Sequence, residues 1–176
     1  AAPRDESHLR ALMHTAASDL VQPWAIRYPR GGSGQPLRNL DLPASAVGKA
    51  EWLREGSGTA ILALGPLCYT ALEAATMSET QTAIADMRFL KPLDTEFLDR
   101  VFARFDAVIT LEDGAVKGGL ASAVASHATA RQYTGKMRHL GIPDVFPTHG
   151  SVAELWKELG YDKDGILAAI HSVQPA

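Results

Sequence analysis

Two arginines three residues apart are the pair in this sequence whose type and spacing most clearly suggest chemistry. Arg27 and Arg30 lie in the octapeptide W-A-I-R-Y-P-R-G, residues 24–31, where a short apolar run of strand composition is stopped by Pro29 and Gly31. A guanidinium presents a rigid fork of donors that matches a phosphate or a carboxylate. The pattern predicts an anion-recognition point at the carboxyl end of a buried strand. Surface ion pairs made by both arginines are the alternative.

A second candidate is the carboxylate loop T-L-E-D-G-A-V-K-G-G-L, residues 110–120, which follows an apolar run. Glu112 and Asp113 could act as an acid and a base or bind a metal ion. However, no histidine or further carboxylate stands at metal-ligand spacing from them. The favoured interpretation is that Glu112 accepts hydrogen bonds from loop amides, while Gly118 and Gly119 allow close packing of helix and strand.

The remaining reactive side chains do not form a complete catalytic set. His149, in the loop G-I-P-D-V-F-P-T-H-G, is the one histidine singled out for a test of function, and a loop-stabilising hydrogen bond is its favoured role. The single cysteine, Cys68, is expected to fill the core near the start of a helix, with a reactive thiol as the minority alternative. One cysteine excludes an internal disulfide framework and fits a reducing compartment.

Alternating strands and helices must position these residues. Strands are expected at 47–53, 59–65, 82–87, 107–111 and 136–141, and helices at 66–77, 94–104, 118–131, from Ser151 onward, and at 162–173. The alternation predicts an α/β fold with three layers, in which helices cover both faces of a mostly parallel five-stranded sheet. Ligands gather at the carboxyl ends of the strands in such sheets.

The first 46 residues read differently from the rest of the chain. A helix is expected from Asp5 and a strand in the octapeptide, and one helix with one strand does not make a domain. We therefore expect residues 1–31 to be the remnant of another domain, 32–46 to be a linker, and 47–176 to be an independent domain. On this interpretation the chain is the C-terminal piece of a larger protein.

Composition excludes several classes of function. The chain has 176 residues, a formal net charge of −3, 46% apolar residues and 21% charged residues. These values are ordinary for a globular protein and give no electrostatic footprint for nucleic acid or for an anionic membrane. No apolar run approaches the length of a membrane span, and the first residues lack the pattern of a signal peptide.

Six strings, taken in order, resemble the 1-deoxy-D-xylulose-5-phosphate synthase family. They are A-I-R-Y-P-R-G, V-G-K-A-E, A-I-L-A-L-G-P-L, D-M-R-F-L-K-P-L-D, V-I-T-L-E-D-G-A-V-K-G-G and H-L-G-I-P-D-V-F-P-T-H-G. The opening P-R-D-E-S-H-L-R-A-L-M resembles the same family, so the resemblance runs from residue 3 to the C-terminus. More distant thiamine-diphosphate enzymes, such as transketolase, share the fold but not both R-Y-P-R-G and D-M-R-F-x-K-P-L-D.

The resemblance implies a fold and an activity. The fold is a transketolase C-terminal domain whose first strand, 47–53, runs antiparallel to the other four, preceded by the last helix and strand of a pyrimidine-binding domain. The intact enzyme is a homodimeric transferase that condenses pyruvate with D-glyceraldehyde 3-phosphate and releases carbon dioxide. It uses thiamine diphosphate and Mg²⁺, serves isoprenoid and thiamine biosynthesis, and is cytoplasmic in bacteria or located in the plastid in plants.

The resemblance also assigns roles to the two arginines. Arg30 matches the family arginine that holds the phosphate of glyceraldehyde 3-phosphate, and Arg27 matches the other arginine of the string, as a second substrate-binding residue. The catalytic, cofactor-binding and metal-binding motifs of the family belong to earlier domains, so this chain alone is expected to be inactive and to bind no cofactor. There are departures: Gly119 is followed by Leu-Ala-Ser, and His149 stands where many members have glutamine.

Two other functions remain open from the sequence. One is a non-catalytic assembly or regulatory module with a transketolase C-terminal fold. The other is a subunit that is completed by a separate chain. The expected helix at 118–131 is rich in Ala and Ser, which favours close packing, so a dimerisation surface is predicted there, although burial within one subunit would explain the same composition.

Overall fold

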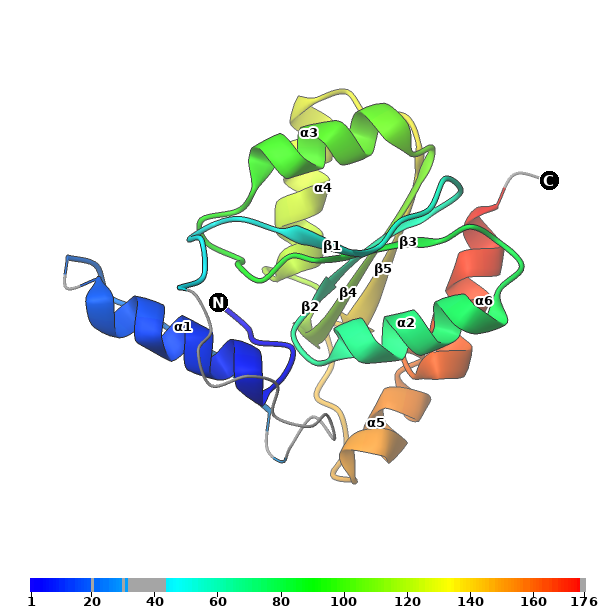
Figure 1. Cartoon of the computed structure of the whole chain (residues 1–176). Coiled ribbons are helices and arrows are strands. Elements are labelled where there is room, and N and C mark those ends of the chain that lie inside the picture. Colours follow the sequence, from blue (N-terminus) through cyan, green and yellow to red (C-terminus); the bar gives the residue numbers. More distant parts are fainter. Residues whose placement is uncertain (20, 30, 32–43, 175–176) are drawn as a thin grey trace.

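A five-stranded sheet forms the centre of the molecule, as the computed structural model shows for residues 1–19, 21–29, 31 and 44–174 (Figure 1). The strand order is β1-β3-β2-β4-β5, with β1 antiparallel to β3 and the other neighbours parallel. The strands are β1 (Glu51–Arg54), β2 (Ala60–Leu64), β3 (Ala83–Asp86), β4 (Ala107–Ala115) and β5 (Lys136–Ile142). The expected fold class, including the antiparallel edge strand, is confirmed.

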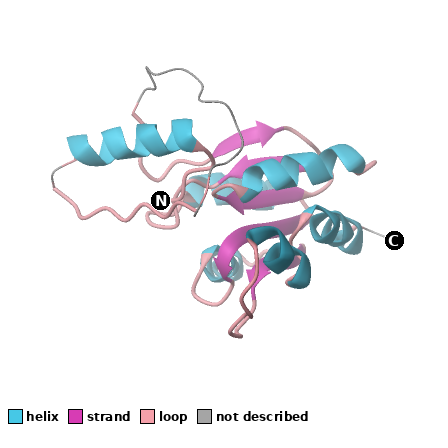
Figure 2. Ribbon diagram, turned by 90° about the horizontal axis from the view of Figure 1, so that it is seen from below, coloured by secondary structure: helices cyan, strands magenta, loops and turns pink. Residues whose placement is uncertain are grey.

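Helices cover both faces of this sheet. The described helices are α1 (Glu6–Ser18), α2 (Leu67–Met77), α3 (Thr95–Arg104), α4 (Leu120–Ala130), α5 (Val152–Glu158) and α6 (Lys163–Val173). In Figure 1, α3 and α4 lie above the sheet and α2 and α6 below it. Figure 2 shows α1 beside these three layers rather than within them. The five strands and five helices expected from residue 47 onward are all present.

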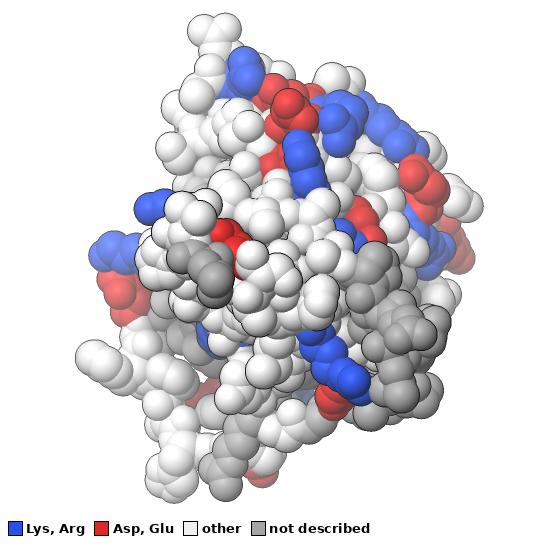
Figure 3. Space-filling model, turned by 60° about the vertical axis from the view of Figure 1, so that its left-hand side comes forward, with Lys and Arg blue, Asp and Glu red and all other residues white. Residues whose placement is uncertain are grey.

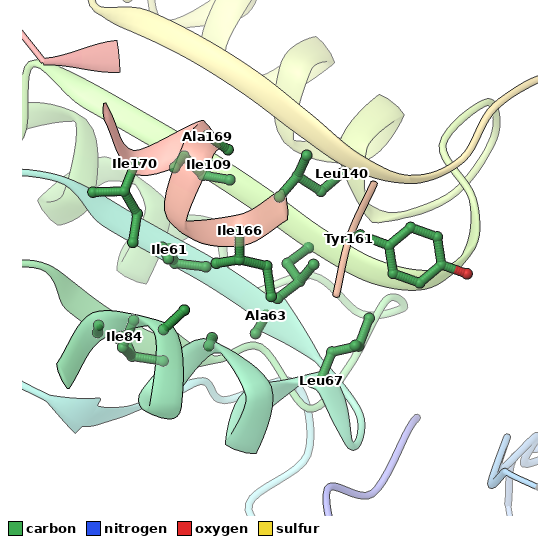
Figure 4. Close-up of a cluster of buried hydrophobic side chains, with 14 of the residues drawn as sticks. Ile61, Ala63, Leu67, Ile84, Ile109, Leu140, Tyr161, Ile166, Ala169 and Ile170 are labelled. Atoms are coloured by element: carbon green, nitrogen blue, oxygen red, sulfur yellow. The ribbon is translucent and has the colours of Figure 1, made fainter. Parts of the chain in front are cut away.

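The central strands are apolar on both sides because both sides are covered. All five residues of β2 are buried. Ile61 and Ala63 belong to the cluster against α2 and α6, whereas Ala60 and Leu62 belong to the cluster against α3 and α4. Figure 4 shows the first cluster, with Ile166 and Ile170 of α6 among its members. Alternate residues of one strand therefore serve two cores.

Side-chain caps account for where several helices begin. The Asp94 carboxylate accepts a hydrogen bond from the Phe97 amide and fixes the start of α3. Ser151 and Glu154 form a reciprocal capping box at α5, as their spacing predicts. Asp5 accepts from the His8 amide at α1.

Several boundaries differ from those expected. Residues 23–29 form no strand; in the described chain their backbone pairs only with Ala1, whose ammonium group donates to the Ala25 carbonyl at 2.8 Å and whose carbonyl accepts from the Arg27 amide at 2.9 Å. A strand needs a longer ladder than one residue supplies. β4 continues to Ala115, and α4 starts at Leu120 rather than at residue 118.

Part of the small-residue content of α4 is explained within the chain. Leu120, Ala121, Val124 and Ala128 of this helix are buried. The dimerisation surface expected on the same helix stays a prediction.

The Asp94 cap should be one of the most sensitive polar positions in the fold. Its second carboxylate oxygen accepts from the Ala50 amide at 3.0 Å, and the residue is buried. Asp94→Ala is expected to lower the free energy of unfolding by about 1–3 kcal/mol, because it removes a cap and leaves a second amide without a partner. Urea titration followed by circular dichroism measures this. Ser151→Ala, at the exposed start of α5, is the matched control, and a loss as large there as at Asp94 would contradict the assignment.

Candidate functional site

Arg27 lies at the carboxyl edge of the sheet, as a ligand-binding arginine in such a fold would. Its Nη2 donates a hydrogen bond to the main-chain carbonyl of Asp113, at the end of β4, and lies 3.9 Å from Asp113 Oδ2. The side chain remains 61% exposed. Two segments 86 residues apart thus meet at this edge, and both interpretations of Arg27, an anion contact and an ion pair, remain compatible with this geometry. Arg30 lies outside the described residues.

The Glu112 carboxylate is committed to structure, as the favoured interpretation of the carboxylate loop predicted. Its two oxygens accept hydrogen bonds from the amides of Leu120 and Ala121, each at 2.8 Å, and the residue is 4% exposed. These are amides of the first turn of α4, which lack partners within the helix. A Cβ at Gly119 would overlap the carboxylate and the Ala115 carbonyl, so a glycine is required there. Glu112 is therefore not free to act as an acid or a base.

Asp113, the other carboxylate of the pair, points to a different set of donors. Its Oδ1 accepts from Trp156 Nε1 at 3.2 Å and from the Tyr161 hydroxyl at 3.3 Å. Burial, followed by the negative charge of Asp113, raises the pKa of Tyr161, so that phenol stays protonated and remains a donor. The carboxylates of Glu112 and Asp113 accept hydrogen bonds from different donors. They do not form an acid–base pair with each other.

An ionic cluster joins α1 to the sheet, and it was not anticipated from the sequence. Arg4 donates through Nη1 to Asp86 Oδ2 at 2.7 Å and also pairs with Glu51. Arg88 pairs with Glu51 from the other side. Asp86 is fully buried, and burial raises the pKa of its carboxyl group even though the Arg4 contact favours the ionised form. The feature of the sequence that could have indicated this cluster is the aspartate at the end of an apolar strand, Asp86 in D-M-R-F.

His8 completes this cluster from α1. Its Nδ1 accepts a hydrogen bond from the Arg4 amide at 3.4 Å, so Nε2 carries the proton in the neutral ring. Burial, with the charges of Arg4 and Arg88, lowers the pKa of His8 to about 3, and Asp5 opposes this only in part. His8 Nε2 and Arg88 Nε are buried without a hydrogen-bond partner among the described residues. Both residues line a cavity of about 580 Å³ between α1 and the sheet.

The other candidates of the sequence are placed as follows. Cys68 is fully buried in the second position of α2, which confirms its role as core filler, and burial raises the pKa of its thiol. His149 is exposed in the loop after β5 and makes no hydrogen bond within the described part of the chain, so the expected loop-stabilising bond is not observed. The described residues contain no group of three or more His, Cys, Asp or Glu side chains that could hold a metal ion.

Charged side chains of both signs are interspersed on one face of the molecule. On the face shown in Figure 3, acidic and basic groups alternate in small clusters between larger neutral areas. This face therefore lacks the continuous basic stripe of a nucleic-acid-binding surface. Among the described helices, none is long and apolar enough to cross a membrane.

Comparison with known proteins decides the family. Residues 48–166 match the transketolase C-terminal domain family. The chain belongs to this family. The solved structure of a split-gene transketolase, described as an inactive β4 tetramer, matches with a TM-score of 0.82 and 30% sequence identity, over 98% of this chain and 55% of that one. The likeness in fold therefore covers nearly the whole chain.

Curated relatives of this chain are named 1-deoxy-D-xylulose-5-phosphate synthase. That of Chlorobium phaeovibrioides is 42% identical over 172 residues, which make up 96% of this chain and 27% of the relative. That of Phocaeicola vulgatus is 39% identical over 176 residues, or 98% of this chain and 28% of the relative. The chain therefore spans little more than a quarter of the length of these relatives, and the resemblance seen in the sequence is confirmed.

The lowered pKa of His8 predicts that the chain loses stability as the pH falls from 7.5 to 5.5. The unfolded chain takes up a proton near the ordinary histidine pKa of 6.5, whereas the folded chain keeps His8 neutral until about 3. The unfolded state therefore gains about 1.4 kcal/mol relative to the folded state at pH 5.5. Urea unfolding at pH 7.5, 6.5 and 5.5 measures the slope, which His8→Gln should flatten. His139, whose pKa burial also lowers, is present in both proteins, and equal slopes in both would show that His8 does not carry the effect.

Proposed function

We propose that this chain is the C-terminal part of a 1-deoxy-D-xylulose-5-phosphate synthase, a thiamine-diphosphate-dependent transferase. The observation that carries the proposal is the match to synthases of that name over nearly the whole chain at about 40% identity. The intact enzyme would condense pyruvate with D-glyceraldehyde 3-phosphate and release carbon dioxide. In this proposal residues 1–31 close a preceding domain, 32–46 form the linker, and 47–176 form the transketolase C-terminal domain.

The role of this portion is to bind the acceptor substrate and to support assembly. Arg30 and Arg27 are proposed to bind the phosphate of the acceptor aldehyde, because a guanidinium matches a phosphate in charge and geometry. The position of Arg27 at the carboxyl edge of the sheet supports this assignment. The intact protein is proposed to be a homodimer of the bacterial cytoplasm or of a plastid.

Among the described residues, the arrangement of side chains does not suit a divalent metal ion. The described part of the chain has no cluster of metal-ligating side chains. The Glu112 carboxylate is occupied by helix amides, so it is unavailable to a cation. Because the catalytic and cofactor-binding motifs of the resembled family belong to earlier domains, we propose that thiamine diphosphate and Mg²⁺ are held by the portion of the enzyme outside this chain.

A second candidate is a subunit completed by a separate chain. The name of the matching solved structure favours it, because a split-gene transketolase divides such an enzyme between two chains. The coding sequence separates the two candidates. An upstream G-D-G…N motif in the same reading frame supports one chain, and a start codon directly before Ala1 supports a separate subunit.

The isolated chain should bind no thiamine diphosphate and form no product. Calorimetry with thiamine diphosphate and Mg²⁺ tests binding, and a coupled assay with pyruvate and glyceraldehyde 3-phosphate tests turnover. The intact enzyme, or the chain mixed with its separate partner, serves as the positive control. Micromolar binding by the isolated chain would overturn the assignment of the cofactor to the rest of the enzyme.

Arg30→Ala in the intact enzyme should reduce kcat/KM for glyceraldehyde 3-phosphate by roughly ten- to several-hundred-fold, since charge-assisted hydrogen bonds are worth about 1.5–3 kcal/mol each. Arg30→Lys should recover only part of this, because an ammonium keeps the charge and loses the fork. The loss should shrink for an acceptor aldehyde that has no phosphate.

Pyruvate provides the internal control for this variant, because formation of the first adduct from pyruvate should change little. Equal losses with phosphorylated and unphosphorylated acceptors would make Arg30 a structural residue and would remove the main support for the proposed role of this portion.

A further inference from the structure

The inference concerns Asp113, which lies where the segment that carries Arg27 meets the sheet. Its main-chain carbonyl accepts the hydrogen bond from Arg27 Nη2, and its Oδ2 is 3.9 Å from the same nitrogen. Asp113 is thus the one described residue to which the Arg27 side chain donates a hydrogen bond. This contact links the R-Y-P-R-G string to the end of β4.

The Asp113 carboxylate is itself held from the other side. Trp156 Nε1 and the Tyr161 hydroxyl both donate to Oδ1, at 3.2 and 3.3 Å. Tyr161 is 1% exposed and belongs to the core cluster against α2 and α6. A chain of contacts therefore runs from the rigid core through Asp113 to an arginine at the surface.

The contact with Asp113 leaves most of the Arg27 guanidinium open. A guanidinium has five N–H donors. In the described part of the chain, Nη2 is the one nitrogen of Arg27 that has an acceptor. Gly114 lies beside the guanidinium, since a Cβ at this position would make an ordinary van der Waals contact with Nη1 at 3.6 Å. The hydrogen bond goes to a neutral carbonyl, with the carboxylate oxygen at a longer distance, so the cation is oriented without a close bidentate ion pair.

We propose that Asp113 is a positioning residue that holds the Arg27 guanidinium ready for the phosphate of the acceptor aldehyde. The inference rests on the proposed function of this chain and adds a residue to it. A long flexible side chain loses rotamer freedom when it binds a ligand, and holding it beforehand lowers that cost. Trp156 and Tyr161 act one step further away, by fixing the Asp113 carboxylate.

The test uses variants of the intact enzyme with two acceptors, glyceraldehyde 3-phosphate and its unphosphorylated analogue. Arg27→Gln should raise KM for the phosphorylated acceptor by about ten-fold or more, since one charge-assisted contact is lost. The double variant Trp156→Phe/Tyr161→Phe removes both anchoring donors and keeps both rings. It should reproduce part of that rise, while KM for pyruvate and for the unphosphorylated acceptor stays unchanged.

Lys117→Ala is the matched control, because Lys117 is an exposed cation of the same loop that pairs with Asp144. This variant should leave KM for both acceptors unchanged. Melting temperatures are measured for every variant, so that a loss of folding is separated from a loss of positioning. A double variant that is destabilised but keeps its preference for the phosphorylated acceptor would show that the contacts to Asp113 are purely structural.

The inference and the proposed function can fail separately. If Arg30→Ala lowers the preference for the phosphorylated acceptor and the Arg27 and Trp156/Tyr161 variants do not, then the positioning role of Asp113 is wrong and the function stands. If no variant in the series, Arg30→Ala included, changes that preference, the proposed phosphate site itself is wrong.

Discussion

The burial of the central strands on both faces is the constraint on which the rest of this structure depends. β2 has no exposed residue, so its backbone must be paired on both edges and its side chains covered on both faces. Parallel neighbours satisfy the edges, and parallel neighbours need helical crossovers, which supply the covering layers. Because the strands of this set are parallel, all of them end at the same edge of the sheet. The polar residues that follow the strands therefore gather at that edge.

Acidic side chains at that edge are stabilised in three different ways. Glu112 receives two helix amides, Asp113 receives an indole and a phenol, and Asp86 receives a guanidinium. In the first two, neutral donors compensate the charge. The third is an ion pair between groups distant in sequence, and removing Arg4 would leave a buried carboxylate without its cation, with the Arg88 amide still donating to it, at a cost of about 3–5 kcal/mol.

The ion pair at Asp86 therefore does more than neutralise a charge. Arg4 directly precedes Asp5, whose carboxylate caps α1 and accepts the Tyr69 hydroxyl of α2 at 2.5 Å. The start of α1 is thus tied both to the end of β3 and to a helix of the sheet domain. This double attachment, together with the burial of Leu12 of α1, explains how a helix outside the three layers keeps a defined place beside them.

Periodic and local features were predictable from the sequence, whereas contacts between distant segments were not. The two-sided apolar run of β2 and the caps at Asp94 and Ser151 depend on residues within a few positions, and each was found as expected. The role of Glu112 was also accessible, because the glycines after it require close packing. In contrast, the Arg4–Asp86 pair spans 82 residues, and no spacing rule connects them.

The octapeptide, residues 24–31, is a second case in which local sequence did not predict the structure, since no strand forms at residues 23–29. Its composition favours a strand, but composition describes only how well a segment fits a pleated surface, and a neighbouring ladder decides whether a strand forms. Within the described residues, the octapeptide has only the backbone of Ala1 to pair with. Among the described residues the segment is also held by side chains: Arg27 donates to the Asp113 carbonyl, and Trp24 donates to Asp19 and packs against the Phe89 ring. Because a side-chain contact constrains orientation less than a ladder does, in the proposed site the network behind Asp113 determines how firmly this arginine is held toward the acceptor phosphate.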